Sequence, residues 1–353
     1  MVFAEVIVDI SVRNLDRPFQ YKIPKELEED AIVGAQVEIP FGKGNRRIKG
    51  YIIGLSDTPL YDIAKTKNIL RVVKESVAAE SHLLALAWWL KENYGSTMND
   101  CIKTVLPVKR EIREKVKKWI YPHKSKEELM EMRELFEKKH YVAKVRVLNG
   151  LLEENHPFPD GISYEEAVQR WGASLSVLKG LEEAGLLEIS KTRDYRNPLE
   201  HTEPDFEKKI PVLHTEQKKI VDIFTKDYEN GVRKSYLIHG VTGSGKTEVY
   251  MRLMEKVLEK GKQVIVLIPE IALTFQTVGR FYERFGSLVS MMHSRLSAGE
   301  RYDQFLRAKN GEVKIMLGPR SALFTPFENL GLIIMDEEHE PSYQSENPPK
   351  YHA

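Results

Sequence analysis

Residues 240–247 are Gly240-Val241-Thr242-Gly243-Ser244-Gly245-Lys246-Thr247, which fits G-x-x-x-x-G-K-[ST] at every fixed position. The apolar run at 235–239 is expected to form a strand before this loop, and residues 247–260 a helix after it. In that order of elements, backbone N–H groups and a helix N-terminus surround a phosphate chain. Lys246 is then expected to reach the β- and γ-phosphates, and the Thr247 hydroxyl to ligate Mg²⁺. Taken alone, the loop could also be a glycine-rich turn without a ligand.

A second motif follows further along the chain, where Leu332-Ile333-Ile334-Met335 precedes Asp336-Glu337-Glu338-His339. Such an apolar run is typical of a central parallel strand, and α/β sheets bind ligands at the carboxyl ends of their strands. Asp336 is therefore expected to hold Mg²⁺, and Glu337 to orient and deprotonate the attacking water. An acidic strand end facing solvent is common, but its pairing with the glycine-rich loop favours a nucleotide hydrolase.

The composition limits the class of protein. The chain has 353 residues, enough for two or three domains. Its 53 basic and 52 acidic side chains nearly cancel, so any nucleic-acid-binding surface must be local. Cys101 is the only cysteine, which argues against a disulfide framework or a cysteine-based zinc site, and it is expected to be buried. No signal-peptide pattern or run of membrane-spanning length is present, so the cytoplasm is the expected compartment.

Residues 1–107 are predicted to form a β-rich domain. Five short β-rich runs, separated by turn residues, indicate a small barrel or an open sheet. An amphipathic helix is expected at 82–94, and one of its adjacent tryptophans, Trp88 or Trp89, is expected in the core because neighbouring helical residues face different directions.

Residues 108–200 are predicted to form a basic linker and a winged-helix-like domain. The stretch 109–126 is strongly basic, which suits either a charged linker or a phosphate-contacting surface. Helices followed by a short strand pair indicate the winged helix, which could bind DNA or act as a spacer. The expected recognition helix, 174–183, carries only Lys179 as a cation, beside Glu182 and Glu183, and this favours a spacer or a partner surface.

Residues 201–353 alternate between strands and helices. This pattern predicts a doubly wound, mostly parallel α/β sheet with helices on both faces. The strands are expected at 235–239, 264–268, 288–292, 313–317 and 331–335, and the helices at 216–230, 247–260, 272–285 and 297–309.

Together these motifs resemble those of superfamily 2 helicases, and more closely those of the PriA family, bacterial helicases that restart stalled replication forks. Four further segments carry the resemblance: Leu213-His214-Thr215-Glu216-Gln217, Ile268-Pro269-Glu270-Ile271-Ala272-Leu273-Thr274, Gly318-Pro319-Arg320-Ser321-Ala322-Leu323-Phe324, and Pro341-Ser342-Tyr343-Gln344 with Lys350-Tyr351-His352-Ala353. The resemblance implies a RecA-like P-loop helicase lobe in which the nucleotide is bound by Gln217, Gly240, Gly243, Ser244, Gly245, Lys246 and Thr247.

The same resemblance assigns roles to the other segments. Gln217 would bind the adenine edge, while Thr274 and Arg320 would lie on the DNA-facing side. Tyr343 and Tyr351 would belong to an aromatic loop that couples DNA contact to ATP hydrolysis. In the family this coupling also involves the residues matched by Glu338 and His339, which would relay the state of the nucleotide to that loop.

The N-terminal segments Pro18-Phe19-Gln20-Tyr21 and Val37-Glu38-Ile39-Pro40-Phe41-Gly42-Lys43 resemble the PriA domain that binds a DNA 3′ end. The resemblance implies that Phe19, Gln20, Gly42 and Lys67 line a pocket for the terminal nucleotide. Phe19 could stack on a base, a contact worth roughly 1–3 kcal/mol, and Lys67 could pair with a phosphate. The family often has an acid where this chain has Gln20, and a neutral amide makes a weaker bond with the 3′-OH. Tyr21 is expected in the core.

For the whole protein the resemblance implies ATP-driven, Mg²⁺-dependent translocation, 3′ to 5′, on single-stranded and forked DNA, with single-strand-binding protein and other primosome proteins as partners and no membrane. The family's second lobe, with its arginine finger and zinc region, is expected outside this chain, so no zinc ligands are expected here. The chain alone is expected to hydrolyse ATP poorly, because an arginine finger contributes roughly 10³–10⁵ in rate. The alternatives are another superfamily 2 translocase, such as a repair or restriction motor, and a non-hydrolysing DNA-binding fragment.

Overall fold

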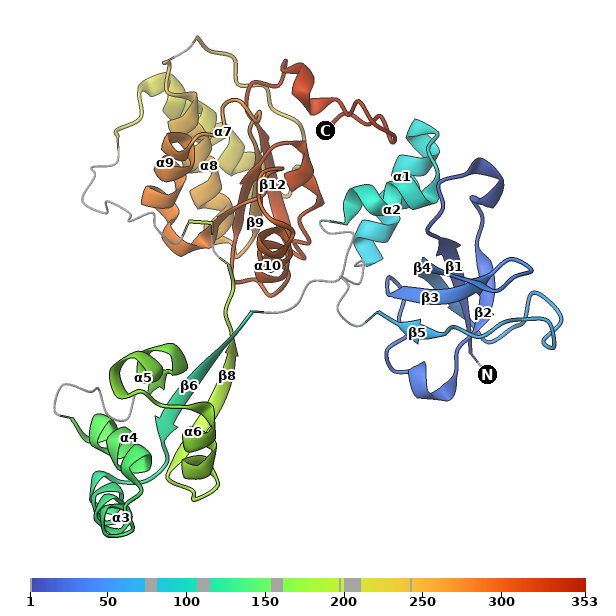
Figure 1. The fold of residues 1–353 in the computed structure, drawn as a ribbon. Helices are drawn as coiled ribbons and strands as arrows, with labels where there is room; N and C mark the ends of the chain where they lie inside the picture. The colour runs from blue at the N-terminus through green and yellow to red at the C-terminus, as the bar shows by residue number, and fades with distance from the viewer. Residues whose placement is uncertain are drawn as a thin grey trace. The chain divides into compact units, whose positions relative to one another are not determined.

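The computed structural model describes residues 2–73, 81–106, 115–153, 161–196, 198–199, 211–241 and 243–353 (Figure 1). Its contacts divide the chain into two compact units, Met1–Arg113 with Arg196–Ala353, and Glu114–Tyr195. The predicted domain boundaries, near residues 107 and 200, and the first part of the basic stretch, 109–114, lie outside the described residues. No helix within the described ranges has the length and apolarity needed to cross a bilayer.

The first unit begins with a five-stranded antiparallel sheet of order β2-β1-β4-β3-β5. Every strand falls on one of the predicted β-rich runs: β1 (Phe3–Val8), β2 (Phe19–Lys22), β3 (Gln36–Phe41), β4 (Arg46–Ser56) and β5 (Arg71–Val72). Tyr21 lies in the core as expected, and burial raises its pKa to about 12. Gly50 allows β4 to approach β1, since a Cβ there would lie 2.5 Å from Val6 Cγ1.

Two helices follow this sheet, α1 (Ser81–Tyr94) and α2 (Met98–Val105). Cys101 is buried, as predicted. The prediction that one of the two tryptophans lies in the core is wrong, because Trp88 and Trp89 are both exposed. The reason is that α1 packs through a stripe of small and aliphatic side chains, and the helical period places both tryptophans outside it. The stripe consists of Leu83, Leu84, Ala87 and Leu90.

The unit Glu114–Tyr195 combines a three-stranded antiparallel sheet of order β7-β6-β8 with four helices. Its elements are β6 (Val116–Pro122), α3 (Lys126–Lys138), α4 (Val142–Leu152), β7 (Ile162–Ser163), α5 (Tyr164–Trp171), α6 (Leu175–Glu182) and β8 (Leu187–Arg193). Serine caps begin α3 and α5: Ser125 forms a capping box with Glu128, and the Ser163 hydroxyl accepts from the Glu166 N–H, as the sequence patterns S-x-x-E at 125–128 and 163–166 predict.

Gly150 on α4 fixes how closely this helix approaches α5. A Cβ at this position would lie 2.1 Å from the Trp171 ring, whereas a Cβ at Gly279, on α9, would meet no atom within 4 Å. Gly150→Ala is therefore expected to destabilise the chain by about 2 kcal/mol through overpacking. Gly279→Ala is the matched control and should stabilise it slightly, by up to about 1 kcal/mol. Urea unfolding checks both, and equal effects of the two substitutions would contradict the packing argument.

The last part of the first unit is a parallel sheet of order β10-β11-β9-β12 with helices on both faces (Figure 1). Its elements are α7 (Thr215–Glu229), α8 (Lys246–Glu259), β9 (Gln263–Leu267), α9 (Phe275–Phe285), β10 (Val289–Met291), α10 (Ala298–Lys309), β11 (Ile315–Gly318) and β12 (Leu330–Met335). On β9, Val264 and Val266 pack with α7, α8 and α9, while Ile265 and Leu267 pack with Ala308 of α10. The predicted doubly wound arrangement is thus present.

Residues 235–239, expected to form the strand before the glycine-rich loop, do not form one in this structure. β12 is consequently an outer strand, and Ile333 on it is exposed. Side-chain contacts hold the segment against α7 instead. The Tyr236 hydroxyl donates to Asp227 Oδ2 at 2.8 Å, and its ring meets that of Phe224 edge-on with centroids 5.5 Å apart. An aromatic contact with a helix therefore replaces the expected strand pairing.

Candidate functional site

The glycine-rich loop ends where α8 begins. Gly245 caps the helix in the left-handed region (φ +82°), and Gly243 is also left-handed (φ +80°), a backbone that glycine adopts at little cost. The Lys246 ammonium turns back over the loop and donates to the carbonyl oxygen of Gly240 at 2.8 Å. Thr247 follows on the first turn of α8. A helix N-terminus and a cation thus meet at one place, an arrangement that binds anions.

Gln217 connects the start of α7 to this loop. Its Oε1 accepts from the backbone N–H of His214 at 2.9 Å, and its Nε2 donates to the carbonyl oxygen of Ser244 at 2.9 Å. A Cβ on Gly245 would lie 2.4 Å from the same amide nitrogen and would displace it, and the left-handed backbone at this position (φ +82°) also favours glycine. Both ends of the amide bind backbone. The expected contact with adenine stays a prediction, and it would require Gln217 to release Ser244.

Asp336 lies beside α8, at the carboxyl end of β12. Its backbone N–H donates to Leu267 O at 2.9 Å, and its Oδ1 accepts from the Tyr250 hydroxyl at 3.1 Å. Burial raises the pKa of Asp336, while the Tyr250 hydrogen bond and the Lys246 charge act in the opposite direction. Thr247 precedes Tyr250 by three residues and therefore lies on the same side of α8. Tyr250 thus joins α8 to Asp336, and the role of Thr247 and Asp336 in holding Mg²⁺ stays a prediction.

Tyr250 and Tyr343 both hold Asp336 in place, a role that the sequence analysis did not assign. The Tyr343 hydroxyl lies 3.0 Å from Leu267 O and 2.6 Å from the backbone oxygen of Asp336. Burial raises the pKa of both hydroxyls, so both stay protonated donors. The spacing of Tyr250 from Thr247 on one helix face is the only sequence signal that indicates such a contact.

The side chains that follow Asp336 lie nearer to solvent. Glu337 has a left-handed backbone (φ +48°), which costs a residue with a Cβ roughly 1–2 kcal/mol and turns the chain sharply after the strand. Its carboxylate lies 3.8 Å from His339 Nδ1, and Glu338 and His339 are exposed. Glu337 is therefore accessible to water, and its catalytic role and the coupling roles of Glu338 and His339 stay predictions.

Thr274 and Arg320, both expected on the DNA-facing side, have different surroundings. Thr274 is exposed and caps α9, with its hydroxyl accepting from the Thr277 N–H at 3.2 Å. A phosphate would be stabilised at such a helix N-terminus. The Arg320 guanidinium instead donates to the backbone oxygens of Ser342, at 3.2 Å, and Gln344. Arg320 thus holds the segment that contains Tyr343.

Tyr343 and Tyr351 are not available for the DNA contact expected of them. Tyr343 is 0% exposed and Tyr351 is 4% exposed. The Tyr351 ring packs edge-on against Phe324 with centroids 5.4 Å apart. Both rings serve as core side chains here, because their apolar surface is buried. A direct contact of either ring with DNA would require it to leave the core, so the DNA-binding role of both tyrosines stays a prediction.

In the N-terminal sheet, three of the four residues expected at the DNA 3′ end lie close together. Lys67 Nζ donates to the carbonyl oxygen of Gly42 at 2.6 Å, and Gly42 occupies a left-handed turn (φ +69°) just after β3. The Phe19 ring packs edge-on against Phe41, the neighbour of Gly42, with centroids 5.3 Å apart. The Arg17 guanidinium lies 5.3 Å from the Phe19 centroid, a cation that the sequence analysis missed.

The fourth of these residues, Gln20, is not presented to a ligand. It is 7% exposed, its Oε1 accepts from the Leu60 N–H at 2.6 Å, and its Nε2 donates to Thr58 O at 3.0 Å. A buried amide requires partners at both ends, and the turn that contains Thr58 and Leu60 supplies them. Gln20 therefore fixes this turn, and its expected bond with a 3′-OH stays a prediction that would require the amide to release Thr58 or Leu60.

Lys67 also lines a shallow pocket of about 550 Å³ between β3, β4 and the loop before β5. Arg47, Lys65 and Lys67 contribute three cations, which suit a ligand rich in phosphate. The remaining lining residues are Pro40, Asn45, Ala64, Thr66, Asn68 and Leu70.

Two known families match the first unit, one over its N-terminal antiparallel sheet and the other over its parallel sheet. Residues 5–107 match the PriA 3′ DNA-binding domain, and residues 214–352 match the DEAD/DEAH box helicase family. The parallel sheet, the glycine-rich loop and Asp336 are thus parts of a DEAD/DEAH box helicase domain that follows a domain for DNA 3′ ends.

The chain belongs to the PriA family. It is 34% identical to the replication restart protein PriA of Bacillus subtilis, with all of this chain and 51% of that protein aligned. It is also 34% identical to PriA of Chlamydia pneumoniae, with all of this chain and 46% of that protein aligned. PriA of Treponema pallidum is 49% identical over 40% of this chain and 21% of that protein. The chain spans about half the length of the first two relatives.

Proposed function

We propose that this chain supplies the DNA-end-binding and first nucleotide-binding parts of an ATP-dependent DNA helicase that acts in replication restart at stalled forks. One observation carries the proposal: a match to a 3′ DNA-binding domain and a match to a helicase domain occur in order in one chain. The hydrogen bond between Tyr250 and Asp336 supports it further, because it joins the helix that begins at Lys246 to the acidic motif. Translocation from 3′ to 5′ is proposed from the resemblance.

ATP is the proposed nucleotide, with Lys246 on its β- and γ-phosphates. Among the described residues, no three His, Cys, Asp or Glu side chains form a metal cage. The donor set fits Mg²⁺, which proteins usually hold through one or two carboxylates together with substrate phosphates. The Asp336 carboxylate and the Thr247 hydroxyl would hold it. Bound Mg²⁺ would neutralise charge on the phosphates, and Glu337 would orient the attacking water.

A DNA 3′ end is the proposed ligand of the N-terminal sheet. Phe19 offers a partly exposed ring with the Arg17 guanidinium over it, and Lys67 and Arg47 offer cations in the neighbouring pocket between β3, β4 and the loop before β5. The contacts of Gln20 with Thr58 and Leu60 give it a positioning role here, so we propose that discrimination for a 3′-OH rests on the neighbouring backbone rather than on this amide.

The decisive experiment measures ATP hydrolysis with and without a DNA fork, for this chain and for a version extended through a second helicase lobe. We expect the fork to stimulate hydrolysis by the extended protein. A repair or restriction motor would hydrolyse ATP equally with forks ending in 3′-OH and 3′-phosphate. A non-hydrolysing DNA-binding protein would bind the fork without ATP turnover, and either result would overturn the proposal.

Lys67→Met is expected to weaken binding of this chain to a fork with a 3′-OH end about fivefold, and to reduce the salt slope of binding by about one. The reason is the loss of one cation beside the proposed terminal phosphate. Fluorescence anisotropy at several salt concentrations checks this. Lys25→Met, an exposed lysine outside this group, is the control, and an equal loss with both variants would show a general charge effect instead.

The unit Glu114–Tyr195 is proposed to be winged-helix-like, with α5 and α6 followed by β8, which pairs with the earlier strand β6. We propose that it contacts a partner or acts as a spacer, because α6 carries Lys179 beside two acids. Single-strand-binding protein and other primosome proteins are the partners proposed from the resemblance. The cytoplasm is the compartment proposed from the sequence pattern.

A further inference from the structure

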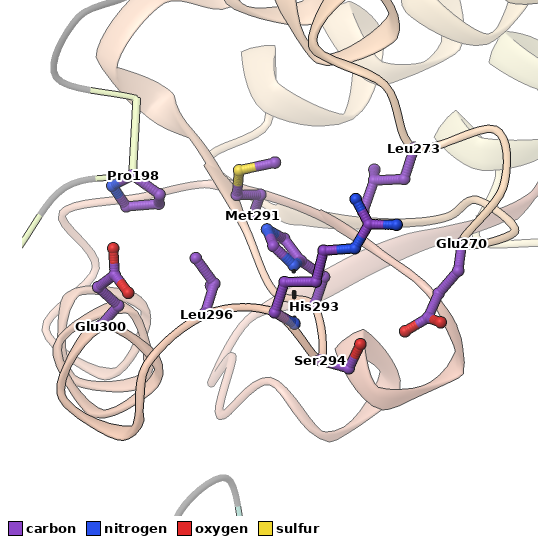
Figure 2. Close-up of a pocket in the computed structure, with 9 residues that line it drawn as sticks. Pro198, Glu270, Leu273, Met291, His293, Ser294, Leu296 and Glu300 are labelled. Carbon is purple, nitrogen blue, oxygen red and sulfur yellow. Dashed lines mark hydrogen bonds between the residues drawn. The ribbon is translucent and has the colours of Figure 1, made fainter.

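A second pocket, of about 340 Å³, lies at the carboxyl ends of β9 and β10 (Figure 2). In the sheet order β10-β11-β9-β12, Asp336 follows the strand at one side and this pocket adjoins the strand at the other. The two sites share no residue. The lining consists of Pro198, Glu270, Leu273, Met291, His293, Ser294, Arg295, Leu296 and Glu300.

The polar groups of this pocket include both donors and acceptors. His293 Nδ1 accepts from the backbone N–H of Arg295 at 3.1 Å. Burial lowers the pKa of His293, so the ring is neutral at pH 7 and carries its proton on Nε2. Glu270 and Glu300 lie on opposite sides of His293 (Figure 2). One Glu300 oxygen accepts from the Ser297 N–H at 2.8 Å, which leaves the other free of that bond.

The pocket has an apolar surface beside its polar groups. The apolar surface consists of Pro198, Leu273, Met291 and Leu296. Figure 2 shows Met291 next to His293. Small-molecule sites typically combine such walls with a few polar groups. A planar ring with hydrogen-bonding edges matches this combination.

A buried network braces the wall that carries Pro198. The Arg196 guanidinium and backbone N–H donate to Asp303 Oδ2 at 2.7 and 3.1 Å, and the Asp303 side chain is fully buried. Gln304 donates to the carbonyl oxygen of Arg196 and accepts from the Ser290 hydroxyl at 2.7 Å. The network therefore fixes the chain two residues before Pro198, and a wall fixed in this way reduces the cost of ordering when a ligand binds.

The charges of this pocket restrict the ligand further. With His293 neutral, Glu270, Glu300 and Arg295 leave one net negative charge, which disfavours a phosphate inside. The carboxylates are separated rather than paired, which disfavours a single ammonium group. The net negative charge and the separated carboxylates together favour a neutral ligand that carries N–H donors. The amino groups of nucleobases are such donors, and they bind carboxylates. Leu273 directly precedes Thr274, whose helix N-terminus could hold the adjoining phosphate.

We propose that this pocket receives one unpaired base of the single strand bound by the helicase domain, and that it prefers bases with an exocyclic amine over thymine. The proposal rests on the proposed DNA-binding function and adds a base-selective site to it. The base enters edge-first, with its amine on Glu270, its faces on the apolar walls and its acceptor receiving the His293 Nε2–H, while Glu300 also caps α10 through the Ser297 N–H.

Fluorescence anisotropy with 12-nucleotide oligo(dC) and oligo(dT) tests the proposal, because cytosine offers an exocyclic amine where thymine offers a carbonyl oxygen. We expect about fivefold tighter binding of oligo(dC), since each correct base-edge contact discriminates by at least this factor. Glu270→Gln should bring the ratio close to one, and so should Leu273→Trp, which fills the pocket. Glu229→Gln, which removes the same charge from the exposed end of α7, should leave the ratio unchanged.

Photocrosslinking with an oligonucleotide that contains 5-iodocytosine is expected to label residues 270–296. Equal affinities of the natural chain for oligo(dC) and oligo(dT) would overturn the proposed base pocket without contradicting DNA binding. A preference for oligo(dC) that persists in both Glu270→Gln and Leu273→Trp would do the same. If neither oligonucleotide binds, the proposed function itself fails. A lysine-rich peptide that binds the natural chain and not Glu270→Gln would overturn the proposal in favour of a basic protein partner.

Discussion

Replacing Lys246 by alanine is expected to weaken binding of a fluorescent ATP analogue with Mg²⁺ roughly 30- to 150-fold. The Lys246 ammonium lies over the glycine-rich loop and is close enough to Asp336 to lower its pKa, although burial of that carboxyl outweighs this effect. A hydrogen bond between a charged group and a phosphate contributes about 2–3 kcal/mol, which corresponds to this change in the dissociation constant. Alanine is a good helix former, so α8 should keep its first turn.

Lys256→Ala on the same helix is the matched control. Lys256 is exposed and forms an ion pair with Glu259, three residues away, and exposed pairs of this kind contribute little. The control should bind the analogue with unchanged affinity. If Lys246→Ala bound it within threefold of the natural chain, the loop would not be the phosphate site and the proposed ATP-dependent function would fail with it.

The sequence predicted most of the helicase domain because its signals are local. Glycines that need left-handed backbone, a lysine at a helix start and an acid after an apolar strand each depend on a few adjacent residues. The positions of Gly243, Gly245, Lys246 and Asp336 therefore agree with expectation. The strand pattern of β9 to β12 was predictable for the same reason, because buried parallel strands are continuous apolar runs.

The contacts between distant segments were not predictable in this way. An aromatic residue in an irregular segment has no period that indicates which side is buried, so Tyr343 and Tyr351 could equally be core or DNA contacts. The resemblance assigns Gln20 to a ligand, and no local pattern indicates its contacts with Thr58 and Leu60, which are far away in sequence. Residues 235–239 have an apolar pattern, but the contacts of Tyr236 with α7 decide their position.

Replacing Tyr343 by alanine is expected to destabilise the chain by about 3–5 kcal/mol, the cost of removing a large buried aromatic side chain. The ring is 0% exposed and lies in the cluster that contains Leu267 and Phe327. Tyr343→Phe should cost only about 1 kcal/mol, since it keeps the ring and loses a hydroxyl donor. Leu267 O would still accept from the Asp336 N–H, so mainly the backbone oxygen of Asp336 would lose a partner.

Urea unfolding of the intact chain measures these losses, and Tyr61→Ala, at an exposed tyrosine, should change stability by less than about 0.5 kcal/mol. The same variants separate two roles of the segment 341–344. If Tyr343 is a core residue that supports Asp336, Tyr343→Ala should lower the free energy of unfolding and Tyr343→Phe should retain DNA binding. If Tyr343→Ala instead weakened binding of single-stranded DNA without loss of stability, Tyr343 would stack on a base, and its hydrogen bond to Asp336 would have to break when DNA binds.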